Sequence, residues 1–114
     1  MATCPFCTVA PDKMIAQNTL TFTVRDTLPV STGHTLIVPK RHIAGIFEAE
    51  PDEVAALWEA LRQARAQLLK ELSPDGFNIG INDGLAAGQT ILHLHIHIIP
   101  RYKGDMPDPR GGIR

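Results

Sequence analysis

Residues 51–72 restrict the fold more than any other segment, because apolar side chains recur there at the three- and four-residue spacing of one helix face. The row consists of Val54, Leu57, Trp58, Leu61, Ala64, Leu68 and Leu72. Pro51 suits a first helical position, and Asp52 and Glu53 oppose the positive end of the helix dipole. Residues 73–76, Ser-Pro-Asp-Gly, then stop the helix. We therefore predict one long helix with one buried face.

Patterns typical of strands lie on both sides of this helix. In residues 19–25, Leu20, Phe22 and Val24 alternate with polar residues, which predicts a strand with one buried face. We predict further strands at 34–38, 77–81 and 90–99, and a short helical turn within 43–50. Two strands, a long helix and two more strands, joined by short links, indicate an α+β fold with a mostly antiparallel sheet.

Length and charge narrow the class of protein. The 114 residues suffice for one core, so we predict a single domain over 1–114. Eleven Lys and Arg side chains nearly balance twelve Asp and Glu and form no basic stripe, which argues against polymeric nucleic acid as a partner. The longest apolar runs are too short to span a membrane, and residues 1–10 do not resemble a signal peptide, so a cytoplasmic location is expected.

Three of the five histidines alternate with aliphatic residues in the last predicted strand. Side chains two positions apart in a strand share a face, so His93, His95 and His97 should lie about 6–7 Å apart in a row. Imidazole can attack phosphorus and then pass the group to water, while its neighbours bind phosphate oxygens or supply a proton. The alternatives are a zinc-dependent hydrolase, although no Asp or Glu adjoins the row, and purely structural histidines.

The run from His93 to Ile99, His-Leu-His-Ile-His-Ile-Ile, resembles the signature of the histidine triad (HIT) family. Gly-Gln-Thr at 88–90 and Gly-His-Thr-Leu-Ile-Val-Pro-Lys at 33–40 extend the resemblance, which covers the chain from about Cys4 to Arg101. The resemblance implies a HIT-like fold of about five strands with one long helix and a short one. It also implies a homodimer, in which the exposed side of the helix with Trp58 is a candidate contact.

The resemblance further implies hydrolysis or transfer at the α-phosphate of a nucleotide, which releases a nucleoside monophosphate such as AMP. His95 corresponds to the nucleophile, His97 to the histidine that binds phosphate and handles the proton, and His34 to a supporting histidine. Nucleoside phosphoramidates and dinucleoside polyphosphates fit the residues equally well as substrates. A nucleotide-binding or scaffold protein with incidental hydrolysis is the alternative from another class.

Other polar residues are candidates for binding a purine nucleotide. Asp26 ends a predicted strand eight residues before His34, where its carboxylate can accept hydrogen bonds from both ribose hydroxyls, or can simply form a turn. Asn82, Gln89 and Thr90 bracket a glycine-containing loop, whose donors are expected to approach phosphate oxygens.

The cysteine pair in Cys4-Pro5-Phe6-Cys7 has the spacing of half a structural zinc site. By the family resemblance, Cys4, Cys7, His42 and His93 form the complete ligand set, which makes residues 1–10 a zinc-binding segment. Two uncoordinated thiols are the alternative. No organic cofactor is expected. Residues 103–114 are predicted to form a flexible polar tail, whose positive charges can help to hold a second phosphate or nucleotide.

Overall fold

Helix α1 (Pro51–Leu72) follows the boundaries that the apolar pattern indicates. In the computed structural model, which describes residues 4–110, the helix begins with a capping box. In this box the Glu50 side chain accepts from the Glu53 amide, and the Glu53 side chain accepts from the Glu50 amide at 2.9 Å. The helix ends at Ser73, which adopts a left-handed conformation with φ of 50°. Local sequence signals therefore set both ends of this element.

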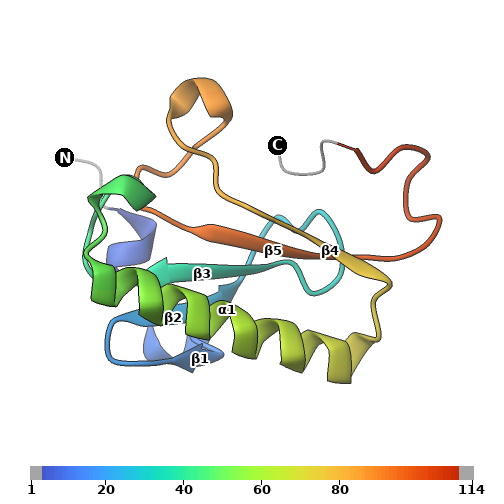
Figure 1. Ribbon diagram of the computed structural model, residues 1–114, viewed down its shortest axis with the longest axis horizontal. Helices are drawn as coiled ribbons and strands as arrows, with labels where there is room; N and C mark the ends of the chain where they lie inside the picture. Colours follow the sequence, from blue (N-terminus) through green and yellow to red (C-terminus); the bar gives the residue numbers. More distant parts are fainter. Residues whose placement is uncertain (1–3, 111–114) are drawn as a thin grey trace.

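A five-stranded antiparallel sheet forms the rest of the framework (Figure 1). Its strands are β1 (Ala16–Gln17), β2 (Thr21–Arg25), β3 (Thr35–Pro39), β4 (Gly76–Gly80) and β5 (Ile96–Arg101). Their spatial order is β1-β2-β3-β5-β4, so the last strand in sequence lies inside the sheet. Residues 4–110 also contain four 3-10 turns, namely η1 (Pro5–Cys7), η2 (Pro11–Lys13), η3 (Ile46–Glu48) and η4 (Leu85–Ala87). The predicted α+β class and antiparallel sheet are confirmed.

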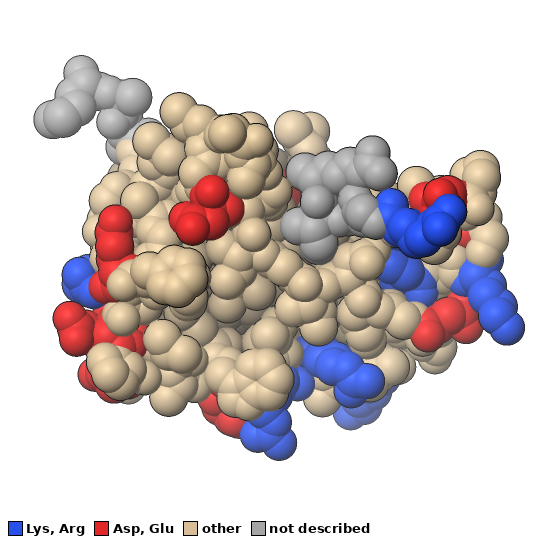
Figure 2. All heavy atoms as spheres, turned by 45° about the horizontal axis from the view of Figure 1, so that its top comes forward, with Lys and Arg blue, Asp and Glu red and all other residues tan. Residues whose placement is uncertain are grey.

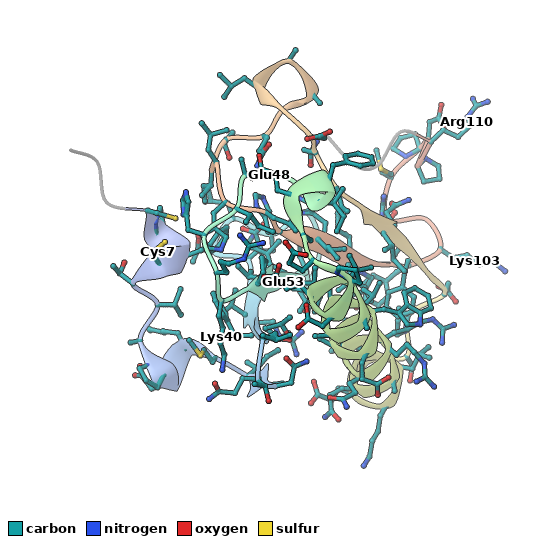
Figure 3. The ribbon with its side chains drawn as sticks, turned by 60° about the vertical axis from the view of Figure 1, so that its left-hand side comes forward. Cys7, Lys40, Glu48, Glu53, Lys103 and Arg110 are labelled. Atoms are coloured by element: carbon teal, nitrogen blue, oxygen red, sulfur yellow. The ribbon has the colours of Figure 1, made fainter. Side chains whose placement is uncertain are left out.

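The sheet has apolar side chains on both faces. Leu57, Leu61 and Leu68 of α1 pack on one face against Ile37, Ile96 and Ile98, which alternate along β3 and β5. The N-terminal segment covers the opposite face, where Phe6 packs with Phe22, Val24, Leu36 and Val38. Helix α1 and the N-terminal segment thus lie on opposite sides of the sheet (Figure 3). The histidine site lies on the face away from α1.

The last strand is shorter than predicted, since regular pairing begins at Ile96 and not at Thr90. The chain before Ile96 is held by other contacts. The Gln89 amide group donates to the carbonyls of Ala44 and Ile91, and the Leu94 amide donates to the Ile43 carbonyl at 2.7 Å. Only His97 of the three histidines therefore lies in a strand. The two-residue strand β1 was not predicted, because residues 16–17 are too few to show alternation.

The C-terminal segment continues along the edge of the molecule. Arg101 is 9% exposed and binds Asp105 and Asn78, while the Lys103 amide donates to Asp75. Residues 111–114 of the predicted tail, with Arg114, and residues 1–3 of the predicted zinc-binding segment lie outside the described residues. Within residues 4–110, no helix has the length and apolar character needed to cross a membrane.

Candidate active site

Strand register brings the predicted catalytic residues to one face of the sheet. Leu36 of β3 pairs with both Val24 of β2 and His97 of β5, so these three side chains form a row across the strands. His34 precedes Leu36 by two residues and so shares its face. On the other side of β5, His97 is paired with Gly80, which has no side chain to cover the imidazole.

The His95 ring is oriented by a backbone contact. Its Nδ1 lies 2.8 Å from the His93 carbonyl oxygen, and because a carbonyl only accepts, Nδ1 carries the proton. The neutral ring therefore has its lone pair on Nε2. The ring centroids of His95 and His97 are 5.1 Å apart, and Phe6 packs on the other side of His95, also at 5.1 Å. His95 is 8% exposed, so its position is set by packing as well as by the hydrogen bond.

A second chain of hydrogen bonds fixes the protons of His34 and His97. The Val30 amide donates to His34 Nδ1 at 3.0 Å, so the proton of neutral His34 is on Nε2. This Nε2 lies 2.9 Å from His97 Nδ1, which must therefore accept. His97 then carries its proton on Nε2. The site thus offers one unprotonated nitrogen, on His95, beside one N–H donor, on His97.

His34 and His97 are both uncharged at neutral pH, because the pKa of each ring is lowered from its ordinary value. The pKa of His97 is lowered from 6.5 to about 4, mainly by burial and also by the neighbouring His95 and His34, against an opposing effect of the Asp26 carboxylate. Burial also lowers the pKa of His34, against the opposing effect of the Asp26 carboxylate. A proton on either ring would be poorly solvated and close to another imidazole.

Asp26 forms the turn that was one of its two predicted roles, and it also lies beside His34. Its Oδ1 accepts from the Leu28 amide at 2.9 Å, as a turn-forming aspartate does. Its Oδ2 lies 3.4 Å from His34 Nε2. The side chain retains 20% exposure, so it is not sealed from solvent.

The three loop residues predicted to bind phosphate differ in burial and in hydrogen bonding. Gln89 is 4% exposed, and its side chain bonds the Gly84 amide and the carbonyls of Ala44 and Ile91, so it shapes the loop. The Asn82 amide group donates to the Ala87 carbonyl at 2.6 Å. Thr90 is exposed. The side-chain contacts of Asn82 and Gln89 thus hold the loop that precedes the histidines, in part by tying it to Ala44.

Cys4, Cys7, His42 and His93 converge as a second group, with ligand atoms that all lie within 4.8 Å of one another. Cys4 Sγ and Cys7 Sγ lie 3.4 and 3.6 Å from His93 Nδ1, and Cys7 Sγ lies 3.1 Å from His42 Nδ1. Ligand atoms on a tetrahedral zinc are about 3.3–3.8 Å apart. Cys7 lies on η1, at the side of the molecule remote from Lys103 and Arg110 (Figure 3).

Proton positions show which group fits a metal. His93 Nε2 lies 2.8 Å from the Pro39 carbonyl and so carries the proton, which leaves the Nδ1 lone pair facing the thiols. Asp26, His34 and His97 also lie within 4.8 Å of one another. His34 Nε2 must carry a proton there, because Nδ1 accepts from the Val30 amide, and a protonated nitrogen cannot bind a metal. The cysteine and histidine donor set fits zinc, and the aspartate group does not.

Sequence reasoning missed three contributors to the site. The Phe6 ring centroid lies 5.7 Å from that of His93 and 5.1 Å from that of His95. Its position between the two cysteines in the sequence could have indicated that it belongs to the site. The Pro39 carbonyl and the Val30 amide fix ring protons. Because these are backbone groups, no side-chain pattern could have indicated them.

Charged side chains are distributed unevenly on the face shown in Figure 2. Acidic residues are spread over this view, from the left to the right, whereas basic residues lie mostly toward the bottom and right, beside acidic ones. That polymeric nucleic acid is not a partner stays a prediction.

Comparison with known proteins gives consistent matches. A family model described as HIT domain matches residues 8–104. Adenylylsulfatase HINT3 of Arabidopsis thaliana is 38% identical over 106 residues, covering 90% of this chain and 54% of the relative. The chain therefore spans about half the length of that relative. The asymmetrical bis(5'-nucleosyl)-tetraphosphatase of Schizosaccharomyces pombe is 39% identical over 80 residues, covering 70% of this chain and 44% of the relative.

Solved structures share the fold. A crystal structure described as a Zn-bound histidine triad family protein from Mycobacterium smegmatis superposes with a TM-score of 0.81 and 34% identity. The match covers 93% of this chain and 84% of that one.

Proposed function

Because the chain belongs to the HIT-domain family, we propose that it is a nucleotide hydrolase in which His95 attacks the α-phosphate. The observation that carries this proposal is the fixed ring of His95. Its Nδ1 proton is bound to the His93 carbonyl, so the neutral ring has its lone pair on Nε2, the nitrogen that would attack phosphorus. Packing against Phe6 and His97 holds the nitrogen in place.

The reaction has two steps. His95 Nε2 forms a bond to phosphorus in line with the leaving group, whose bond to phosphorus breaks, and the leaving amine or phosphate takes up a proton. Water then attacks the nucleotidyl-His95 intermediate and releases the nucleoside monophosphate. The Nε2–H of His97 donates to a phosphate oxygen as charge builds up there, while Asp26 accepts from the ribose hydroxyls. We assign Asn82, Gln89 and Thr90 to the loop that borders the phosphate.

The names of the relatives support nucleotide substrates but differ in the leaving group. One relative is named as an adenylylsulfatase and another as a dinucleoside tetraphosphatase. We propose a purine nucleotide with AMP as the product. Phosphoramidates and dinucleoside polyphosphates stay equal candidates, and transfer of the nucleotidyl group to a second phosphate would share the first step.

The test is release of nucleoside monophosphate from adenosine phosphoramidates, adenylyl sulfate and diadenosine polyphosphates, by wild type and His95→Ala. Activity that is lost in the variant, together with a nucleotidyl adduct on His95 in rapidly quenched wild type, is the expected result. The control is Asp12→Asn, which alters an exposed residue of η2. Equal activity in wild type and His95→Ala, or none in either, would favour the alternative of a nucleotide-binding protein.

We further propose a structural zinc held by Cys4, Cys7, His42 and His93. The donor geometry and the Zn-bound neighbour support it. Zinc would tie η1 to the segment before β5 and would take no part in the chemistry. Metal analysis should give about one zinc per chain, and Cys7→Ser should lower this content. A content far below one in wild type would exclude the four-ligand site.

The assembly that we propose is a homodimer. Strand β4 is an outer strand of the sheet, and Ile79 on it is 46% exposed, while Trp58 of α1 is 62% exposed. Such features suit an interface. Sedimentation at micromolar concentration should give twice the chain mass, and a monomer would contradict the proposal. The cytoplasmic location stays a prediction.

A further inference from the structure

We propose that the backbone amide of Val30 is a positioning group that sets which nitrogen of His97 carries the proton. The functional consequence rests on the proposed function, but the position of the proton can be measured without turnover. The Val30 side chain is 58% exposed, and it is the N–H of this residue that reaches the site.

Two proton arrangements are possible for a hydrogen-bonded pair of neutral imidazoles. In the first, His34 Nε2 donates to His97 Nδ1, and His97 presents an N–H at Nε2. In the second, both protons move to the opposite nitrogens, and His97 presents a lone pair at Nε2. These arrangements differ in chemistry, because only the first can donate to a phosphate oxygen.

The Val30 amide selects the first arrangement. A proton on His34 Nδ1 would face the Val30 N–H at the present separation of 3.0 Å, so two donors would oppose each other. Asp26 acts in the same direction, because its Oδ2 lies 3.4 Å from His34 Nε2 and favours a proton there. Water has little access to separate the two opposed donors, since His34 is 3% exposed.

The arrangement also defines the chemical role of His97. Because its Nδ1 accepts from His34, a second proton on His97 would have to be placed on Nδ1, opposite the His34 N–H. The hydrogen bond from His34 Nε2 to His97 Nδ1 therefore also keeps His97 neutral. We infer that His97 acts as an uncharged hydrogen-bond donor to the phosphate, and not as an imidazolium acid.

Nitrogen-15 NMR of the histidine rings tests the proposal directly, because protonated and unprotonated ring nitrogens have distinct shifts. Wild type should show His34 and His97 both protonated on Nε2. Val30→Pro, which removes the N–H, should populate the second arrangement and lower kcat roughly tenfold, the effect of about one hydrogen bond. The matched control Val30→Ala keeps the N–H and should leave the shifts and kcat unchanged.

Several results would overturn the proposal. One is a wild-type His97 protonated on Nδ1, and another is a folded Val30→Pro whose ring shifts equal those of wild type, even if its activity falls. If Val30→Pro does not fold, the wild-type spectrum still decides, together with slow hydrogen exchange of the Val30 amide. An amide that exchanges as fast as an exposed loop would contradict the bond to His34. If the proposed hydrolysis is wrong but this inference is right, wild type will show His34 and His97 protonated on Nε2 and no turnover of any substrate.

Discussion

Acidification should destabilise the fold through His97. In the folded chain burial lowers the pKa of this imidazole to about 4, whereas an unfolded chain has the ordinary value near 6.5. Between these pH values the unfolded state binds a proton that the folded state does not, so the free energy of unfolding falls as pH falls. The difference of about 2.5 pH units corresponds to about 3–4 kcal/mol before solvent screening. His97 is only partly buried, so we expect about 1–3 kcal/mol after solvent screening.

Urea unfolding at pH 7, 5.5 and 4.5 measures this loss, with a chelator present throughout so that release of zinc does not contribute. His97→Gln is the comparison, because glutamine is polar and does not titrate in this range. The variant should lose less stability than wild type between pH 7 and 4.5. His34 acts in the same direction and accounts for part of what the variant still loses. Parallel losses in wild type and variant, or a wild type that gains stability, would refute the reasoning.

Further substitutions test the packing that supports the site. Gly33→Ala should cost about 2–4 kcal/mol, measured by urea unfolding, because a Cβ at φ of +90° would lie 2.6 Å from a leucine methyl group of α1. Leu68→Ala should cost about 2–5 kcal/mol, whereas Leu69→Ala, at a 38% exposed position, should cost less than about 1. Glu53→Ala removes one of the two hydrogen bonds of the capping box and the 2.7 Å contact with Arg41, and should lower the free energy of unfolding by about 1–3 kcal/mol, measured by thermal unfolding.

The parts of the fold that sequence predicted correctly are those with a local cause. Helix α1 has an apolar row, an N-terminal proline and a terminating loop, and each acts over a few residues. Strands β2, β3 and β4 lie within two residues of their predicted bounds, because alternation and flanking prolines or glycines are also local. The start of β5 was predicted too early, because a strand requires a partner. Before Ile96 the chain is bonded to Ile43 and to the Gln89 side chain instead.

The candidate site shows the same division. The alternation of His93, His95 and His97 indicated chemistry, and the cysteine spacing indicated metal, from the sequence alone. The alternation alone predicts one row of three histidines, whereas the family resemblance assigned His93 to zinc and His95 and His97 to the chemistry. His93 turns its Nδ1 to the cysteines, and His97 turns its own to His34. Which nitrogen carries each proton depends on carbonyls and amides that are distant in sequence, so no pattern of residue types could predict it.

The place of β5 has a consequence for synthesis on the ribosome. This strand is made last but lies between β3 and β4, with which it forms two of the four ladders of the sheet. Until residue 101 has emerged, Ile37 and α1 lack the apolar surface of Ile96 and Ile98 that completes their cluster. The nascent chain must therefore hold exposed apolar surface until β5 has been made. The histidine row emerges with the strand that closes the sheet, so the site and a completed fold arrive together.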